Sequence, residues 1–201
     1  MSENKISHPD MVRKLFKDPT TIKLSPEQVN LLHAAVGLAG EAGEVLDMVS
    51  GNPIDALKDP AGLRSKITNE LGDMEFYIEA FCQGFGYPSE GFDTRHDMAS
   101  TLVADYPAIF ISIHASALLD AVKKQLFNNR NDLRDSIKSR LGMIRAHMAD
   151  LRYKLELTYG ETLDANITKL SARYEGLEYS DKAAAARKDE KKAKPGDTKD
   201  I

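Results

Sequence analysis

The chain has 201 residues, and 42% of them are hydrophobic and 29% charged. That much apolar content can form a core, so the composition excludes a wholly disordered protein. The 27 Lys and Arg against 31 Asp and Glu give a net charge of −4, which argues against a dedicated nucleic-acid-binding protein. The most apolar stretch, residues 106–122, is too short to span a membrane. With a single cysteine, Cys82, and no apolar signal segment, we expect a soluble cytoplasmic protein without membrane or specific nucleic-acid partners.

Helical signals begin after an N-terminal arm at residues 1–23. Ser25-Pro26-Glu27-Gln28 has the pattern of a capping box, which predicts a helix from there to about Val49. Asp59-Pro60 starts a second helix that continues to about Phe85. Its apolar residues recur at intervals of three and four and form a narrow stripe for a core: Leu63, Ile67, Leu71, Met74, Ile78, Phe81 and Phe85.

The second half of the chain has the same helical character. After a loop at residues 87–100, we expect helices at about 107–127, 132–159 and 162–174. Residues 24–178 are therefore predicted to form a single all-α domain, an antiparallel bundle with a four-helix core and extra helices. From residue 181 the composition changes to Ala, Lys, Asp and Glu without apolar periodicity, which predicts a disordered charged tail at residues 181–201.

Two pairs of carboxylates lie on the first two predicted helices: Glu41 with Glu44, and Glu70 with Asp73. At a spacing of three residues each pair projects from one side of its helix, and Glu70 falls within the apolar stripe. Carboxylates on an inward face are costly unless they are paired or bind a metal. Mg²⁺, and Mn²⁺ as a substitute, prefer such oxygen ligands, so the four side chains are candidate metal ligands. The alternative is that both pairs are solvated acidic faces.

Three glycines, Gly37, Gly40 and Gly43, lie on the helix that carries the first acidic pair. Each is a poor helix former and costs about 1 kcal/mol relative to alanine. Their presence predicts close approach by another helix or by a ligand.

The segments 33–47 and 69–77 resemble the MazG-like all-α nucleoside triphosphate pyrophosphohydrolases, whose pattern is E-x-x-E, a spacer, and E-x-x-D. Here 25 residues separate Glu44 from Glu70. A later block, Asn166-Ile-Thr-Lys169-Leu-Ser-Ala-Arg173-Tyr174, is similar to the N-x-x-K-L-x-x-R-Y segment of that family. The resemblance covers about residues 24–86 and 160–176. One departure is Met48-Val49-Ser50, where many relatives carry a lysine that contacts phosphate.

The resemblance implies hydrolysis of a (deoxy)nucleoside triphosphate to the monophosphate and pyrophosphate with Mg²⁺ or Mn²⁺. It implies that Glu41, Glu44, Glu70 and Asp73 hold the metal and that a glutamate of the first pair activates the attacking water. Asn166, Lys169 and Arg173 share one helix face and can meet the triphosphate opposite the metal. Candidate substrate-binding residues are Asn166, Lys169, Arg173, Tyr174, Asn30, His33 and Tyr77, the last three for the base. We expect a purine such as dGTP or dATP, and a homodimer or homotetramer.

The middle of the chain parallels the first motif region, which aligns residues 24–86 with residues 106–160. In this alignment His114, Ala117 and His147 take the positions of the glutamates of the acidic pairs. It predicts a duplicated helix pair that has lost its acidic site, with the two histidines neutral. The alternative is chance similarity between apolar helices.

Other classes of protein fit the sequence less well. A carboxylate di-iron bundle needs E-x-x-H on two helices, and the sequence contains none. The dipeptide His96-Asp97 is a weak indication of a different phosphohydrolase. The non-enzymatic alternative is a helical-bundle interaction protein whose acidic strip binds a basic partner. Such a protein would tolerate Glu70→Gln and would release no pyrophosphate from any dNTP.

Overall fold

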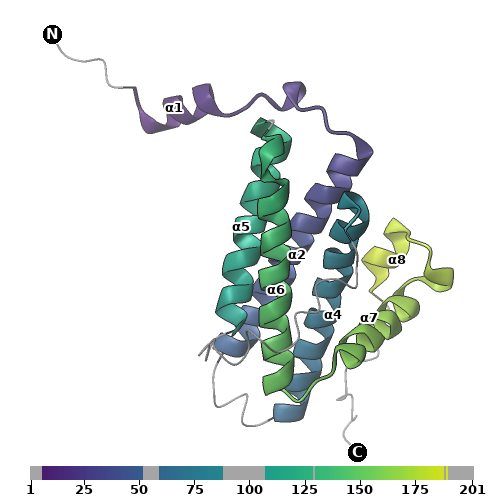
Figure 1. The fold of residues 1–201 in the computed structure, drawn as a ribbon. Helices are drawn as coiled ribbons and strands as arrows, with labels where there is room; N and C mark the ends of the chain where they lie inside the picture. The colour runs from purple at the N-terminus through teal and green to yellow at the C-terminus, as the bar shows by residue number, and fades with distance from the viewer. Residues whose placement is uncertain (1–5, 52–58, 88–106, 129, 188, 190–201) are drawn as a thin grey trace, which may run out of the picture.

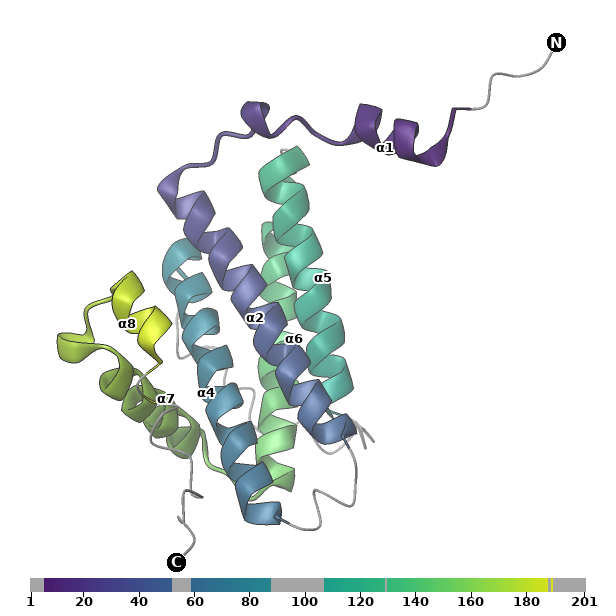
Figure 2. The same cartoon turned by 180° about the vertical axis from the view of Figure 1, so that it is seen from behind.

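The structure is a computed structural model that describes residues 6–51, 59–87, 107–128, 130–187 and 189. These residues form helices, turns and loops without a β-strand, so the predicted all-α fold is confirmed. The long helices α2 (Pro26–Ser50), α4 (Pro60–Phe85), α5 (Pro107–Asn128) and α6 (Arg134–Lys154) form a bundle (Figure 1). The helix α2 contacts both α4 and α5, and α5 contacts α6. A shorter helix, α7 (Tyr159–Arg173), packs on the outer side of α4, as the view from behind also shows (Figure 2).

Local capping contacts explain where the first two long helices begin and end. The Ser25 hydroxyl accepts a hydrogen bond from the Gln28 N–H, and the Gln28 side chain accepts one from the Ser25 N–H, as the sequence predicts. The Asp59 side chain accepts from the Gly62 N–H at 2.8 Å and so caps α4. This helix ends at Gly86, which takes the left-handed conformation with φ 67°.

The predicted helix at 132–159 is wrong at its C-terminal end. The helix α6 stops at Lys154, and Glu156 in the following turn has φ 53°. The next helix starts earlier than expected because Thr158 and Glu161 form a capping box that the sequence interpretation overlooked. As a result α7 runs over residues 159–173 in place of the expected 162–174.

Both ends of the chain contain helix that the sequence interpretation left out. A short helix, α1 (His8–Leu15), lies in the N-terminal arm and is capped by Ser7. A six-residue helix, α8 (Asp181–Ala186), lies within the segment for which the composition predicts disorder. Beyond it only residues 187 and 189 are described, so the rest of the predicted tail lies outside the described residues. His96 and Asp97 also lie outside them.

The core lies between the four long helices, and it includes the predicted stripe of α4. All members of this stripe are buried except Leu63, which is half-buried. The stripe packs with fully buried residues of the other helices, among them Leu38 on α2, Leu118 on α5 and Ile144 on α6. Because each such side chain contributes about 1.5–3 kcal/mol on burial, the core fixes α2 against α4. None of the described helices is long and apolar enough to cross a membrane.

A buried ion-pair network joins α4 to α6, and the sequence interpretation missed it. The Glu75 side chain is only 2% exposed and lies 3.3 Å from Arg145 Nε and 3.2 Å from Arg152 Nη1. The Arg152 guanidinium also lies over the ring of Tyr159, 5.1 Å from its centroid. Because Tyr159 is the first residue of α7, this network holds the start of α7 beside α4.

Candidate metal and phosphate site

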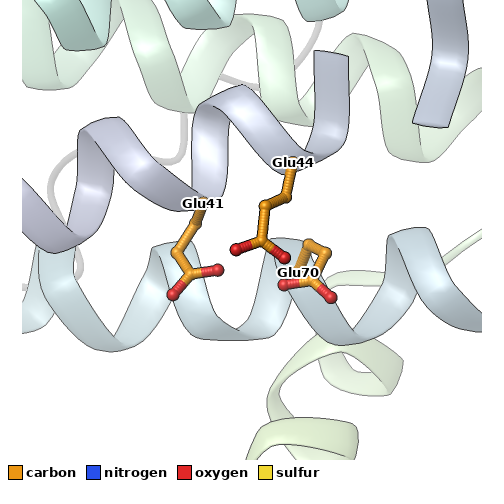
Figure 3. A group of neighbouring side chains, drawn as sticks. All are labelled: Glu41, Glu44 and Glu70. Carbon is orange, nitrogen blue, oxygen red and sulfur yellow. The ribbon is translucent and has the colours of Figure 1, made fainter. Parts of the chain in front are cut away.

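Three glutamates from two helices gather at the α2–α4 interface. Glu41 and Glu44 come from α2 and Glu70 from α4, and their side chains point toward one another (Figure 3). One carboxylate oxygen from each residue lies within 4.8 Å of those of the other two. Glu41 and Glu70 are half-buried and Glu44 is exposed. This is an open-sided set of hard oxygen donors of the kind that suits Mg²⁺ or Mn²⁺.

The electrostatics of this group favour a bound positive charge. Burial, a hydrogen bond with Glu70 and the surrounding carboxylates raise the pKa of Glu41 to about 8. Burial also raises the pKa of Glu70, although the hydrogen bond with Glu41 and the charge of Lys169 oppose this rise. At neutral pH a proton therefore remains between the two side chains. A divalent cation can replace that proton because it stabilises all the carboxylates at once.

Asp73, the fourth predicted metal ligand, is not a member of the group of three. Its carboxylate faces α7, where Asn166 Nδ2 donates to Oδ1 at 2.7 Å and Lys169 Nζ forms an ion pair with Oδ2. The side chains of Asp73 and Lys169 are 14% and 22% exposed. Asp73 therefore lies between the three glutamates and α7, and it contacts Asn166 and Lys169 on that helix.

The close packing of α7 on α4 depends on Gly72, a residue that the sequence interpretation gave no role. A Cβ atom at this position would lie 2.5 Å from the Thr162 carbonyl oxygen and 2.9 Å from Asn166 Cβ. Only glycine leaves room for α7 at this distance. The stretch from Glu70 to Asp73 thus supplies two carboxylates and also the surface on which α7 docks.

The predicted phosphate-binding residues lie along α7, with different partners. Asn166 and Lys169 contact Asp73, whereas Arg173, one turn later, forms a two-bond ion pair with Asp189. The ring of Tyr174 packs against that of Tyr179, 5.7 Å between centroids. Asn166, Lys169 and Arg173 therefore provide an amide and two cations beside the acidic group.

Two of the predicted base-binding residues, Tyr77 and His33, lie together where α4 meets α2. The Tyr77 ring covers Gly37, where a Cβ atom would lie 2.2 Å from Tyr77 Cζ. Burial and the charges of Glu41 and Asp73 raise the pKa of the Tyr77 hydroxyl. The ring of His33 meets that of Tyr77 edge-on at 5.9 Å, and Asn30 is exposed. Tyr77 is therefore close to the three glutamates, and His33 contacts Tyr77.

The expectation for the three glycines of α2 holds at one of them. Close approach by another helix is confirmed at Gly37, where the Tyr77 ring of α4 fills the space. At Gly40 and Gly43 a Cβ atom would meet no heavy atom of another described helix within 4 Å. No packing between the described helices therefore explains these two glycines.

The two histidines that align with Glu41 and Glu70 also lie together. The rings of His114 on α5 and His147 on α6 stack with 5.6 Å between centroids. Arg140 Nη1 lies 2.9 Å from His114 Nδ1, and burial lowers the pKa of both histidines. The α5–α6 pair thus carries neutral rings where the α2–α4 pair carries carboxylates. The duplication itself stays a prediction.

Comparison of the chain with models of protein families, with curated proteins and with solved structures finds no match. Its function must therefore be inferred from the residues of the site and their geometry. The described residues offer carboxylates that suit a divalent cation on one side and cationic side chains that suit an anion on the other. A metal complex of a polyphosphate combines both charges.

Proposed function

We propose that the protein is a nucleoside triphosphate pyrophosphohydrolase that converts a (d)NTP to the (d)NMP and pyrophosphate with Mg²⁺ or Mn²⁺. The observation that carries the proposal is the gathering of Glu41, Glu44 and Glu70 from two helices next to the cationic face of α7. The order of the E-x-x-E, E-x-x-D and N-x-x-K-L-x-x-R-Y motifs supports it.

In this proposal the three glutamates hold the metal through carboxylate oxygens. When bound, a divalent cation lowers the pKa of a coordinated water and offsets the charge on the phosphates. Asp73 is the proposed fourth ligand, and a metal ion there would compete with Lys169 for that carboxylate. A substrate phosphate provides the alternative partner for Lys169. Substrate binding and completion of the metal site are thereby coupled.

The residues of the chain would position the substrate and accept a proton. Asn166, Lys169 and Arg173 would hold the phosphates in line with the attacking water. As the water oxygen bonds to phosphorus, the phosphoanhydride bond between the α and β phosphates breaks and pyrophosphate leaves. The water proton passes to Glu41 or Glu44.

The proposal extends to the base and to the assembly. Tyr77 and His33 offer adjacent rings near the acidic group, and we propose that they contact a purine base, with dGTP or dATP as the substrate. Exposed apolar side chains on α5, among them Phe110 and Ile113, support a homodimer or homotetramer.

The decisive experiment incubates the protein with each of the four dNTPs and Mg²⁺ and separates the products. We expect monophosphate and pyrophosphate in equal amounts, fastest with a purine. Glu70→Gln removes a metal-binding oxygen and should lower the rate at least about 100-fold. Glu27→Gln, an exposed glutamate at the start of α2, is the matched control and should leave the rate unchanged.

Other products would contradict the proposal in distinguishable ways. Diphosphate with orthophosphate would indicate cleavage at the terminal phosphate and a different class of enzyme. No product from any dNTP, with Glu70→Gln as stable as the wild type, would favour the interaction protein with an acidic partner-binding strip.

A further inference from the structure

Arg173 forms an ion pair with Asp189, a carboxylate from the C-terminal segment. Arg173 Nε donates to Asp189 Oδ1 at 2.8 Å, and Nη2 donates to Oδ2 at 2.5 Å. The two side chains are only 14% and 7% exposed. This is a planar two-bond contact, the geometry in which arginine also binds phosphate.

The chain must reverse direction to bring Asp189 back to α7. It turns through η4 (Glu175–Leu177), where Leu177 has φ 58°, and then forms α8. Arg187 has φ 40° at the end of α8, a left-handed conformation that side chains with a Cβ rarely adopt. The packing of Tyr179 on Tyr174 holds the start of this return. Residues 174–187 thus turn the chain back from the end of α7, and Asp189 meets Arg173.

The place where Asp189 lies has the properties of an anion site. Arg173 is its direct partner, and the charge of Lys169 also helps to lower the pKa of the Asp189 carboxyl. Both cations belong to the face of α7 that lies next to the acidic group, since Lys169 also contacts Asp73. The Asp189 carboxylate therefore lies against Arg173, on the face of α7 that also carries Lys169, and both cations are suited to phosphate oxygens.

We propose that Asp189 occupies a phosphate-binding site formed by Arg173 and Lys169, so that the C-terminal segment competes with the polyphosphate of the substrate. The competition with substrate rests on the proposed function, whereas the anion site does not. Because only the fraction of molecules with Asp189 displaced can bind phosphate there, the contact weakens the apparent affinity by that fraction. The polyphosphate carries several negative charges against one on Asp189, so it can displace the carboxylate.

The experiment compares the full-length wild type with Asp189→Asn, Asp189→Ala and the control Asp181→Asn. Asp181 also lies in the C-terminal segment, but it is exposed and contacts Tyr179, so its substitution changes the net charge equally and leaves Arg173 paired. The first measurement is the affinity for inorganic pyrophosphate by calorimetry, without metal. The second is KM for the dNTP that is hydrolysed fastest.

Both Asp189 variants should bind pyrophosphate about three- to tenfold more tightly and show a KM lower by a similar factor, and Asp181→Asn should match the wild type. Unchanged or weaker pyrophosphate binding in the Asp189 variants would overturn the inference, as would a gain of the same size in Asp181→Asn. Hydrolysis with an unchanged KM would refute the competition while the proposed function stands. Tighter pyrophosphate binding without hydrolysis of any dNTP would support the anion site but refute the proposed function.

Discussion

Binding of a divalent cation at the three glutamates should release a proton, because Glu41 holds one in the metal-free protein. With a pKa of about 8, Glu41 is about 90% protonated at pH 7 and about 10% protonated at pH 9. A cation that binds the carboxylate must displace this proton. We therefore expect about 0.9 proton released per ion at pH 7 and about 0.1 at pH 9. Between pH 6 and 7 the affinity for Mn²⁺ should rise close to tenfold.

Titration calorimetry with Mn²⁺ at pH 7 in two buffers of different ionisation enthalpy measures the released protons directly. Glu41→Gln removes the carboxyl with the pKa of about 8, so the heat of any remaining Mn²⁺ binding should depend less on the buffer. Glu27→Gln keeps the site and should behave as the wild type. Buffer-independent heat in the wild type, or an affinity that stays flat from pH 6 to 8, would refute the assignment of the proton to Glu41.

The proton on Glu41 also determines whether the folded protein becomes more or less stable as the pH rises. Glu41 has a higher pKa in the folded state, about 8, than its ordinary value of 4.5, so the folded state binds more protons between these values. Its contribution makes the metal-free protein less stable as the pH rises from 4.5 to about 8. Thermal unfolding in EDTA should show a falling Tm over this range, and Mg²⁺ should reduce the fall. A Tm that rises toward pH 8 in EDTA would contradict this reasoning.

Two predictions concern the framework around the site, and urea unfolding measures both. Gly72→Ala places a Cβ against the backbone of α7 and should cost about 1–3 kcal/mol, whereas Gly40→Ala, where space is open, should stabilise by up to about 1 kcal/mol. Equal effects of the two substitutions would contradict the packing of α7 on Gly72. Glu75→Gln removes the buried carboxylate that Arg145 and Arg152 share and should cost about 3–5 kcal/mol. A loss of unfolding free energy below about 1 kcal/mol would show that Glu75 does not form these ion pairs in solution.

The helices and the core stripe could be predicted because their signals are local. The capping box at Ser25, the cap at Asp59 and Gly86 at the end of α4 each act within a few residues. The end of α6 was mispredicted because apolar residues continue through the turn and hide the cap at Thr158. A search for capping boxes inside long apolar patterns would have found this boundary.

Only the part of the site that follows from residue spacing along a helix could be predicted. A spacing of three residues places Glu41 and Glu44 on one side of α2, but it does not say what lies opposite Asp73. That depends on α7, which packs on Gly72 and brings Lys169 to this carboxylate. The pairing of Arg173 with Asp189 likewise follows from a chain reversal in a segment without apolar periodicity.

The contrast between Glu75 and the three glutamates at the α2–α4 interface gives the strongest argument for a cation at the site. Glu75 is deeply buried, and the fold supplies it with two arginines from α6. Among the described residues no such ion pair reaches Glu41, Glu44 or Glu70, and burial together with the neighbouring carboxylates raises the pKa of Glu41 so that it retains a proton near neutral pH. A charge that served only the fold could be balanced in the way Glu75 is. Lys169 offsets only part of the repulsion among the three carboxylates, since the pKa of Glu70 stays raised, and a divalent cation removes the rest.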